Sequence, residues 1–428
     1  MKQEPGNPDL NIEKRGELKW LIAILFWAFV ARVAVAWYLH KGGEFYWSDE
    51  WFYDSIARNL LLGNGYVSNN PANPLRAEPT VMWPPGQPLF LAFVYFFTGS
   101  SIFAARLAGT LVAVIGLLAV WLIGKELNLD RRVRLTSVFL LSFYPYYIFV
   151  PATLYPQIGT STLLALSVWL LLFAYNRFGT ARSYLAASGA GLAAGLCSLF
   201  TPYTIAGVPL GALWLWKINK QKPMFKQAVL FTLLSAVIFI GWPIRNYLEY
   251  GRPLVSVQLG FNLWTANNEQ ATTREGNWIV PPPDMQARLD QADELGQYDI
   301  YVSDAKQFIR ENPGKYLKLV AMRTVNFFSP YPLMPVTANE FQSPKTRFIG
   351  GASYFLLLTF ALVGLVVFIR KGGNIRLASV ILTHYLPVLL VTALIVYRDR
   401  YRLPLDQYLT IFAGYALVWI LDKIKKRN

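Results

Sequence analysis

Long runs of apolar residues recur along the chain and are separated by short polar segments. Each run is close to the length of about 20 residues that a helix needs to cross a bilayer, and none has the period-two alternation of a strand. This pattern predicts an all-α polytopic membrane protein with about ten transmembrane helices. The predicted spans are Leu18 to Leu39, Ile102 to Gly124, Leu135 to Val150, Ile158 to Tyr175, Tyr184 to Phe200, Pro202 to Ile218, Gln227 to Ile244, Phe348 to Ile369, Leu377 to Val396 and Leu403 to Leu421.

Lysine and arginine are concentrated in one set of connections, which predicts that this set is cytoplasmic. The set comprises residues 1–18, 125–134, 176–183, 217–226, 370–376 and 422–428. With ten spans these segments all lie on one side, so both termini are expected to be cytoplasmic. The pattern explains most of the net charge of +15. We therefore expect membrane lipids, and no nucleic acid, among the partners.

Two outer segments divide the chain. Residues 1–244 form a predicted N-terminal transmembrane module whose first outer loop is 40–101, residues 245–347 form a long outer loop, and 348–428 form the C-terminal transmembrane helices. In the first loop we predict a helix that begins at Ser48 and lies along the membrane surface, and a short helix after Pro84 and Pro85. In the long loop, 303–312 and 315–328 have helical patterns, whereas the stretch NLWTANNEQ is predicted to form turns.

Two adjacent acids, Asp49 and Glu50, lie in the first turn of the predicted surface helix. Asp49 can act as a general base towards an acceptor hydroxyl, and Glu50 can orient it, bind a metal or shift its pKa. The alternative is that both acids merely interact with the positive end of the helix dipole. Asp54 is expected on a solvated helix face unless it reaches a cleft, and Glu78 is expected to be a loop acid unless it binds a metal or an acceptor.

The outer connection before the last span contains three arginines in the stretch YRDRYRLPLDQY, which violates the positive-inside pattern. Arg398, Arg400 and Arg402 therefore need a partner outside, and a guanidinium suits a phosphate. The alternative is snorkelling to headgroups and pairing with nearby aspartates. The further candidate substrate contacts are Arg106 and Arg245, near the outer ends of spans, Asn246 beside Arg245, and Trp264, whose ring could stack on a sugar.

Several motifs occur in a characteristic order: SDEWFYDSIARNLLLGNGY, WPPGQPLFLAFVY, GWPIRNYLEYGRP, NLWTANN and YRDRYRLPL. This order resembles the bacterial membrane glycosyltransferases of the GT-C class. The similarity is greatest to the dolichyl-phosphate-mannose protein mannosyltransferase-like family 39 and to the lipid A aminoarabinose transferase type. It implies residence in the cytoplasmic (inner) membrane of a prokaryote, a polyprenyl-phosphate-linked sugar donor, an active site on the outer face, and a lipid, glycan or protein acceptor.

By resemblance, Asp49 is the catalytic position, with Glu50 beside it, and Arg245, Arg400 and Arg402 bind the lipid phosphate together with the neighbouring Arg398. The chain departs from many relatives at two positions, since Gln157 stands where they have an acid and Thr201 lies where they have an arginine nearby. The resemblance establishes no cofactor. A divalent metal stays an open alternative, with Asp49, Glu50 and Glu78 as its candidate ligands.

The chemistry of the donor explains why acids and arginines would meet at the membrane edge. The reacting carbon must stay at the interface, the leaving phosphate needs fixed positive charge, and the acceptor must lose a proton. Direct attack would invert the anomeric configuration. The alternative function is a transporter or flippase of a lipid-linked or amphipathic anion, whereas a membrane scaffold would leave the outer arginines unexplained.

Overall fold

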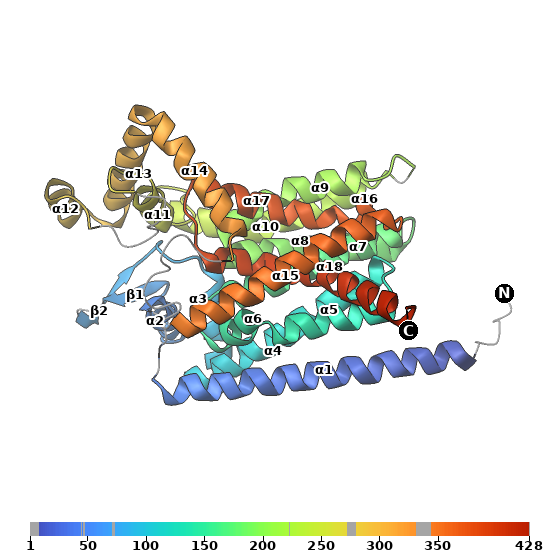
Figure 1. Ribbon diagram of the computed structural model, residues 1–428. Helices are drawn as coiled ribbons and strands as arrows, with labels where there is room; N and C mark the ends of the chain where they lie inside the picture. Colours follow the sequence, from blue (N-terminus) through green and yellow to red (C-terminus); the bar gives the residue numbers. More distant parts are fainter. Residues whose placement is uncertain are drawn as a thin grey trace.

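The computed structural model describes residues 8–43, 45, 48–70, 73–221, 223–271, 280–330 and 344–427. Within these ranges, eight helical segments are long and apolar enough to span a membrane. They lie in a bundle of helices that confirms the predicted all-α membrane architecture (Figure 1). The helices are α1 (Pro8–Lys41), α4 (Ile102–Glu126), α7 (Gln157–Asn176), α8 (Ala181–Phe200), α10 (Phe225–Tyr250), α15 (Pro344–Arg370), α16 (Ile375–Ala378) with α17 (Val380–Leu394), and α18 (Asp399–Lys425).

The predicted count of about ten spans is not confirmed. A ninth span arises among the described residues if α5 (Arg131–Phe143) is joined to α6 (Pro145–Phe149) and the 3₁₀ turn η1 (Val150–Ala152), which bend by 68° at the break. The predicted span from Pro202 to Ile218 is a 3₁₀ turn, η2 (Pro202–Ala206), followed by α9 (Gly207–Lys217), which has only 11 residues. At about 1.5 Å per residue, α9 covers roughly half of the hydrocarbon core.

The first outer loop packs as a small unit at one end of the bundle (Figure 1). The predicted helices are confirmed as α2 (Ser48–Leu61) and α3 (Gly86–Thr98). Between them, β1 (Val67–Asn70) and β2 (Asn73–Pro79) form an antiparallel hairpin that pairs Val67 with Pro79. The sequence analysis did not predict these strands, because their residues are mostly polar and do not alternate clearly.

Four helices of the long outer segment lie at the same end (Figure 1). They are α11 (Gln258–Ala266), α12 (Pro283–Asp290), α13 (Glu294–Glu311) and α14 (Pro313–Phe328). The two helices predicted here are confirmed as α13 and α14. The predicted turns at NLWTANNEQ are wrong for residues 262–266, which lie in α11, where Trp264 is buried against Met285, Leu289 and Ala305. They are confirmed for residues 267–270, which form bends and a turn.

Arg323 connects this outer unit to the bundle. Its buried guanidinium donates hydrogen bonds to the carbonyl oxygens of Ala266, Ala393 and Leu394 and to Oδ1 of Asn267. These partners lie at the ends of α11 and α17, so a single side chain on α14 holds three helices together. Burial lowers the pKa of Arg323 to about 10, which leaves it charged at neutral pH.

We expect Arg323→Ala to release α11 from α17. Hydrogen bonds to a charged group contribute about 1.5–3 kcal/mol each, so local opening should become at least about tenfold more frequent. Amide hydrogen exchange over residues 258–268 measures this, with Arg310→Ala as the control, since Arg310 is exposed on neighbouring α13. Equal protection in both variants would refute the anchoring role.

Candidate active site at one end of the bundle

Asp49 and Glu50 occupy the first turn of α2 but face different surroundings. Adjacent residues on an α-helix point about 100° apart. The Asp49 side chain keeps 19% of its surface exposed, whereas Glu50 is completely buried and its charge acts on the equally buried Arg106 of α4. The two acids therefore have different environments, and Glu50 faces the interior.

Asp49 meets Arg400, which comes from the beginning of α18 at the other end of the chain. Nη2 of Arg400 lies 3.6 Å from Oδ2 of Asp49, and the guanidinium lies 5.0 Å from the centre of the Tyr155 ring. Burial raises the pKa of Tyr155, with a further contribution from the hydrogen-bonded Asp49 carboxylate that the charge of Arg400 opposes. The phenol therefore remains protonated at neutral pH.

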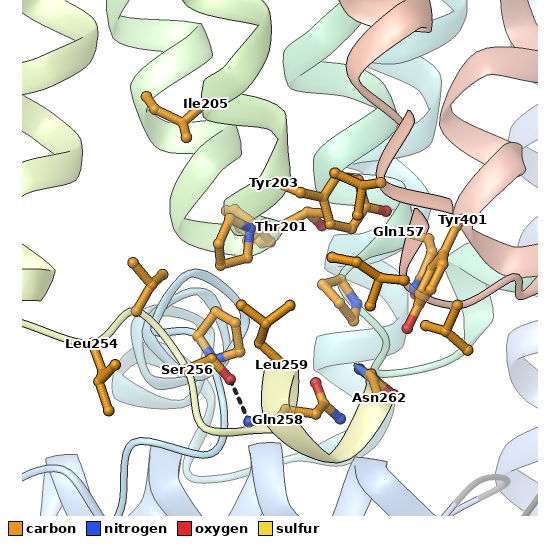
Figure 2. A pocket seen from close by; sticks show the side chains of 18 of the residues that line it. Gln157, Thr201, Tyr203, Ile205, Leu254, Ser256, Gln258, Leu259, Asn262 and Tyr401 are labelled. Carbon is orange, nitrogen blue, oxygen red and sulfur yellow. Dashed lines mark hydrogen bonds between the residues drawn. The ribbon is translucent and has the colours of Figure 1, made fainter. Parts of the chain in front are cut away.

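A cavity of about 540 Å³ adjoins this pair. Arg400 and Tyr155 line it, together with Tyr53, which lies one helical turn after Asp49 on α2. Figure 2 shows that the wall is built by segments far apart in the sequence, including Gln157 at the start of α7, Tyr401 of α18 and the helix α11. One part of the wall is apolar, with Phe239, Leu254, Leu259, Val391 and Ile395 among its residues.

Among the described residues that line the cavity, Arg400 is the only charged one. Arg402 is nearly fully buried elsewhere, where its Nε lies 3.4 Å from Oδ1 of Asp406 and its guanidinium covers the Tyr354 ring at 3.3 Å. It also donates to the carbonyl oxygens of Phe327 and Ser329. Arg398 precedes α18 and is half-buried, outside the cavity lining.

Arg245 also lies outside the cavity lining. It donates to the carbonyl oxygens of Thr80 and Tyr66 and to Oδ1 of Asn246, and its guanidinium approaches three aromatic rings, those of Tyr66, Trp242 and Tyr250. Asn246 in turn donates to the Leu254 carbonyl oxygen. These contacts connect the end of α10 with the first outer loop.

The remaining candidates are placed away from the cavity. The expectation that Asp54 lies on a solvated face is wrong, because α3 covers that face and Asp54 accepts hydrogen bonds from Tyr95 and Arg58, both at 2.6 Å. Glu78 is exposed on β2 and not in a loop. Trp264 is buried, and its Nε1 donates to Asp304 at 2.7 Å.

The part of the chain that the structure describes contains no cluster of typical metal ligands. No group of three or more histidine, cysteine, aspartate or glutamate residues there is arranged to hold a metal ion. Glu78 thus does not join Asp49 and Glu50 in such a group.

The sequence analysis missed several polar residues of the cavity. Tyr155 and Tyr401 contact Arg400 through their rings, and Ser256, Gln258 and Asn262 contribute polar side chains from the long outer segment. The spacing of Gln258 and Asn262 by one helical turn was the available signal. Only Asn262 falls in the stretch predicted to form turns, so the sequence did not place the two residues on one helix.

Glu294, at the start of α13, connects the long outer segment to the first outer loop. Its carboxylate accepts hydrogen bonds from Oγ1 of Thr80 at 2.7 Å and from the backbone N–H of Val81 at 2.9 Å. Burial raises the pKa of Glu294 above its ordinary value of 4.5 and outweighs these hydrogen bonds, which favour the charged form.

Because the folded protein binds this proton more tightly than the unfolded chain, the resulting stabilisation is complete below pH 4.5 and is lost as the pH rises through the raised pKa. Melting temperatures of the purified protein, measured from pH 4.5 upwards, should therefore fall more steeply in wild type than in Glu294→Gln. Glu311→Gln, an exposed acid on the same helix, is the control and should follow wild type. Parallel curves for wild type and Glu294→Gln would contradict the prediction.

Residues 83–244 match the family described as dolichyl-phosphate-mannose-protein mannosyltransferase. In fold, the chain is similar to the archaeal oligosaccharyltransferase AglB of Archaeoglobus fulgidus, solved with an inhibitory peptide and a dolichol-phosphate, with a TM-score of 0.57 at 15% identity. The predicted resemblance to GT-C membrane glycosyltransferases is confirmed.

The structural alignment with AglB covers 94% of this chain but only 50% of AglB, so the chain spans about half the length of that structure. ArnT of Cupriavidus metallidurans, solved with undecaprenyl phosphate, aligns at 12% identity over 93% of this chain and 78% of its own, with a TM-score of 0.47. No curated protein sequence matches. At 15% identity, the similarity to AglB shows a common fold and nothing finer.

Proposed function

We propose that the protein is a membrane glycosyltransferase that moves a sugar from a polyprenyl-phosphate donor to an acceptor at the outer face of the membrane. The observation that carries this proposal is the pair of Asp49 and Arg400 beside the cavity. A carboxylate and a fixed guanidinium are the two charges that such a transfer needs. The family match to a dolichyl-phosphate-mannose-dependent transferase supports the same reaction class.

In this mechanism the donor phosphate binds Arg400, and Asp49 accepts the proton of the acceptor hydroxyl. The acceptor oxygen attacks the anomeric carbon, the bond from that carbon to the phosphate oxygen breaks, and the polyprenyl phosphate leaves with the electron pair. Attack from the side opposite the phosphate inverts the anomeric configuration. Without donor, Arg400 interacts with Asp49; a bound phosphate would compete for the guanidinium and free the carboxylate to act as a base.

The other candidate residues then support the site without touching the substrate. Glu50 with Arg106 holds α2 against α4, and Arg245 with Asn246 holds the first outer loop against α10. The apolar wall near Phe239 and Ile395 suits the first isoprene units of the donor. The helices α2 and α11, which contribute residues to the cavity wall, lie at the end of the bundle opposite to the beginning of α1 and the end of α18 (Figure 1). Cytoplasmic termini would therefore put the cavity on the outer side of a prokaryotic inner membrane.

The test is transfer of label from a radiolabelled polyprenyl-phosphate sugar by the protein in proteoliposomes. Membranes from cells that lack this chain supply the lipid, glycan and protein acceptors. We expect label on an acceptor with wild type and none with Asp49→Asn. Label that crosses the bilayer while still attached to its lipid would instead establish the flippase alternative and overturn the proposal.

A further inference from the structure

Tyr155 contacts both charged members of the candidate site. Its hydroxyl is hydrogen-bonded to the Asp49 carboxylate, and the centre of its ring lies 5.0 Å from the Arg400 guanidinium. The side chain borders the cavity, although only 3% of the residue is exposed. The proposed transfer uses the two charges and gives no role to either the hydroxyl or the ring of Tyr155.

A rigid frame holds Tyr155 between η1 and α7. Its backbone N–H donates to Oγ1 of Thr153 at 3.4 Å, and Pro156, which follows it, disfavours a helical backbone at Tyr155. The ring packs edge-on against Tyr53 at 5.8 Å, and Tyr53 packs edge-on against Trp83 at 5.3 Å. These uncharged contacts place the hydroxyl independently of the charged pair.

Donor binding would change the surroundings of Asp49. Nη2 of Arg400 lies 3.6 Å from Oδ2 of Asp49, and a phosphate on the guanidinium would compete for it. A carboxylate has two oxygens and about four acceptor positions in all. A hydroxyl can therefore hold one oxygen while the other accepts a proton. The orientation of a general base matters because proton transfer needs a hydrogen-bonded geometry.

We propose that Tyr155 is a positioning residue of the transfer reaction, whose hydroxyl holds the Asp49 carboxylate towards the acceptor and whose ring orients the Arg400 guanidinium towards the donor phosphate. This inference rests on the proposed function, because it assigns Asp49 to the acceptor proton and Arg400 to the phosphate. Tyr155 transfers no proton itself, since burial raises the pKa of its phenol and keeps it protonated.

The groups that face Asp49 come from three parts of the chain. Tyr53 lies one turn later on α2, Tyr155 precedes α7, and Arg400 is at the beginning of α18. Burial raises the pKa of Tyr53 as well, so both phenols stay protonated and the guanidinium stays charged at neutral pH. The neighbouring acid, Glu50, faces the interior. The pH dependence of transfer is therefore a suitable measure of how Asp49 is held.

A second group of the same three residue types on and beside α2 supplies a matched control. Tyr95 of α3 donates to Oδ1 of Asp54 at 2.6 Å, and Arg58 donates to the same carboxylate at 2.6 Å. The Arg58 guanidinium lies 5.4 Å from the centre of the Tyr95 ring, and Tyr95 is 1% exposed. None of the three is among the described residues that line the cavity. Loss of the Tyr95 hydroxyl should therefore affect stability alone.

The hydroxyl is tested by Tyr155→Phe in proteoliposomes with the radiolabelled polyprenyl-phosphate sugar and the membrane acceptors. We expect turnover per folded molecule to fall at least about tenfold while the donor KM stays within about twofold, because the ring beside Arg400 remains. The acid limb of the pH–rate profile should move to higher pH, because a hydroxyl that donates to a carboxylate favours its charged form. Tyr95→Phe should keep the turnover and the profile of wild type.

The ring is tested without turnover, by titration of the purified protein with undecaprenyl phosphate. Tyr155→Phe should bind this lipid within about twofold of wild type, whereas Tyr155→Leu, which lacks a ring, should bind it at least about threefold more weakly. Tyr95→Leu is the control and should bind it like wild type. If Tyr155→Leu does not fold, the turnover and pH profile of Tyr155→Phe decide alone.

The outcomes separate this inference from the proposed function. If Tyr155→Phe has the turnover and pH profile of wild type, or if Tyr95→Phe changes them equally, the inference fails. Wild-type lipid affinity in folded Tyr155→Leu also overturns it. In each case the function stands as long as wild type transfers the sugar and Asp49→Asn does not. If wild type neither transfers the sugar nor binds undecaprenyl phosphate, both fail.

Discussion

Asp49→Asn is expected to lower the rate of sugar transfer by at least about a hundredfold, the scale of a lost general base. The amide keeps the shape of the carboxylate but cannot accept the proton of the acceptor hydroxyl. The donor should still bind, because Arg400 and the cavity wall remain. Transfer of radiolabel under saturating donor measures the rate, and donor titration measures the affinity.

The matched control is Asp299→Asn. Asp299 is also an outer acid paired with an arginine, since Arg252 donates to it at 2.7 Å, but this pair is exposed and outside the cavity lining. It should leave transfer unchanged. Activity of Asp49→Asn within a few-fold of wild type would reduce Asp49 to a partner of Arg400 and of the helix dipole.

Substitution of Arg400 and of Arg402 should have different effects, the first on donor binding and the second on the stability of the fold. Arg400→Ala should weaken donor binding by about 1.5–3 kcal/mol, the range for a hydrogen bond to a charged group, with little loss of folded protein. Lysine at this position should restore part of the affinity, because it keeps the charge but cannot bind two oxygens as a fork. Donor titration is the measurement.

Arg402→Ala should instead destabilise the fold by about 3–5 kcal/mol, because Asp406 would remain as a buried charge without its partner. Thermal unfolding in detergent tests this, and whatever protein folds should bind donor normally. Arg252→Ala, which removes an exposed guanidinium, is the control for both variants. Loss of donor affinity in Arg402→Ala without loss of stability would reverse the assignment.

Tertiary contacts form one helix of the long outer segment, α11, that the local sequence does not indicate. Its polar stretch NLWTANNEQ lacks an obvious helical stripe, so propensity favoured turns. In the structure, Trp264 is buried against α12 and α13, and Arg323 satisfies the carbonyl oxygen at the end of α11. Packing against distant helices therefore stabilises a helix that the local sequence does not predict. The same packing brings Gln258 and Asn262 to the cavity.

What the sequence alone determined is the helical membrane architecture, and it predicted that the candidate acids and arginines lie in connections on one side of the membrane. Apolar runs of bilayer length can only be satisfied as helices, since lipid offers no hydrogen-bond partners to the backbone, and the acids and arginines stand in the connections at their outer ends. What only the tertiary structure decided is which of these charges meet. Asp49 and Glu50 differ by about 100° around α2, and Arg400 and Arg402 by about 200° around α18. One member of each pair therefore reaches the cavity edge while the other is buried. Which one does so depends on the distant parts of the chain that cover the other: Arg106 of α4 lies near Glu50, and Tyr354 of α15 covers Arg402. No local pattern in the sequence records these contacts.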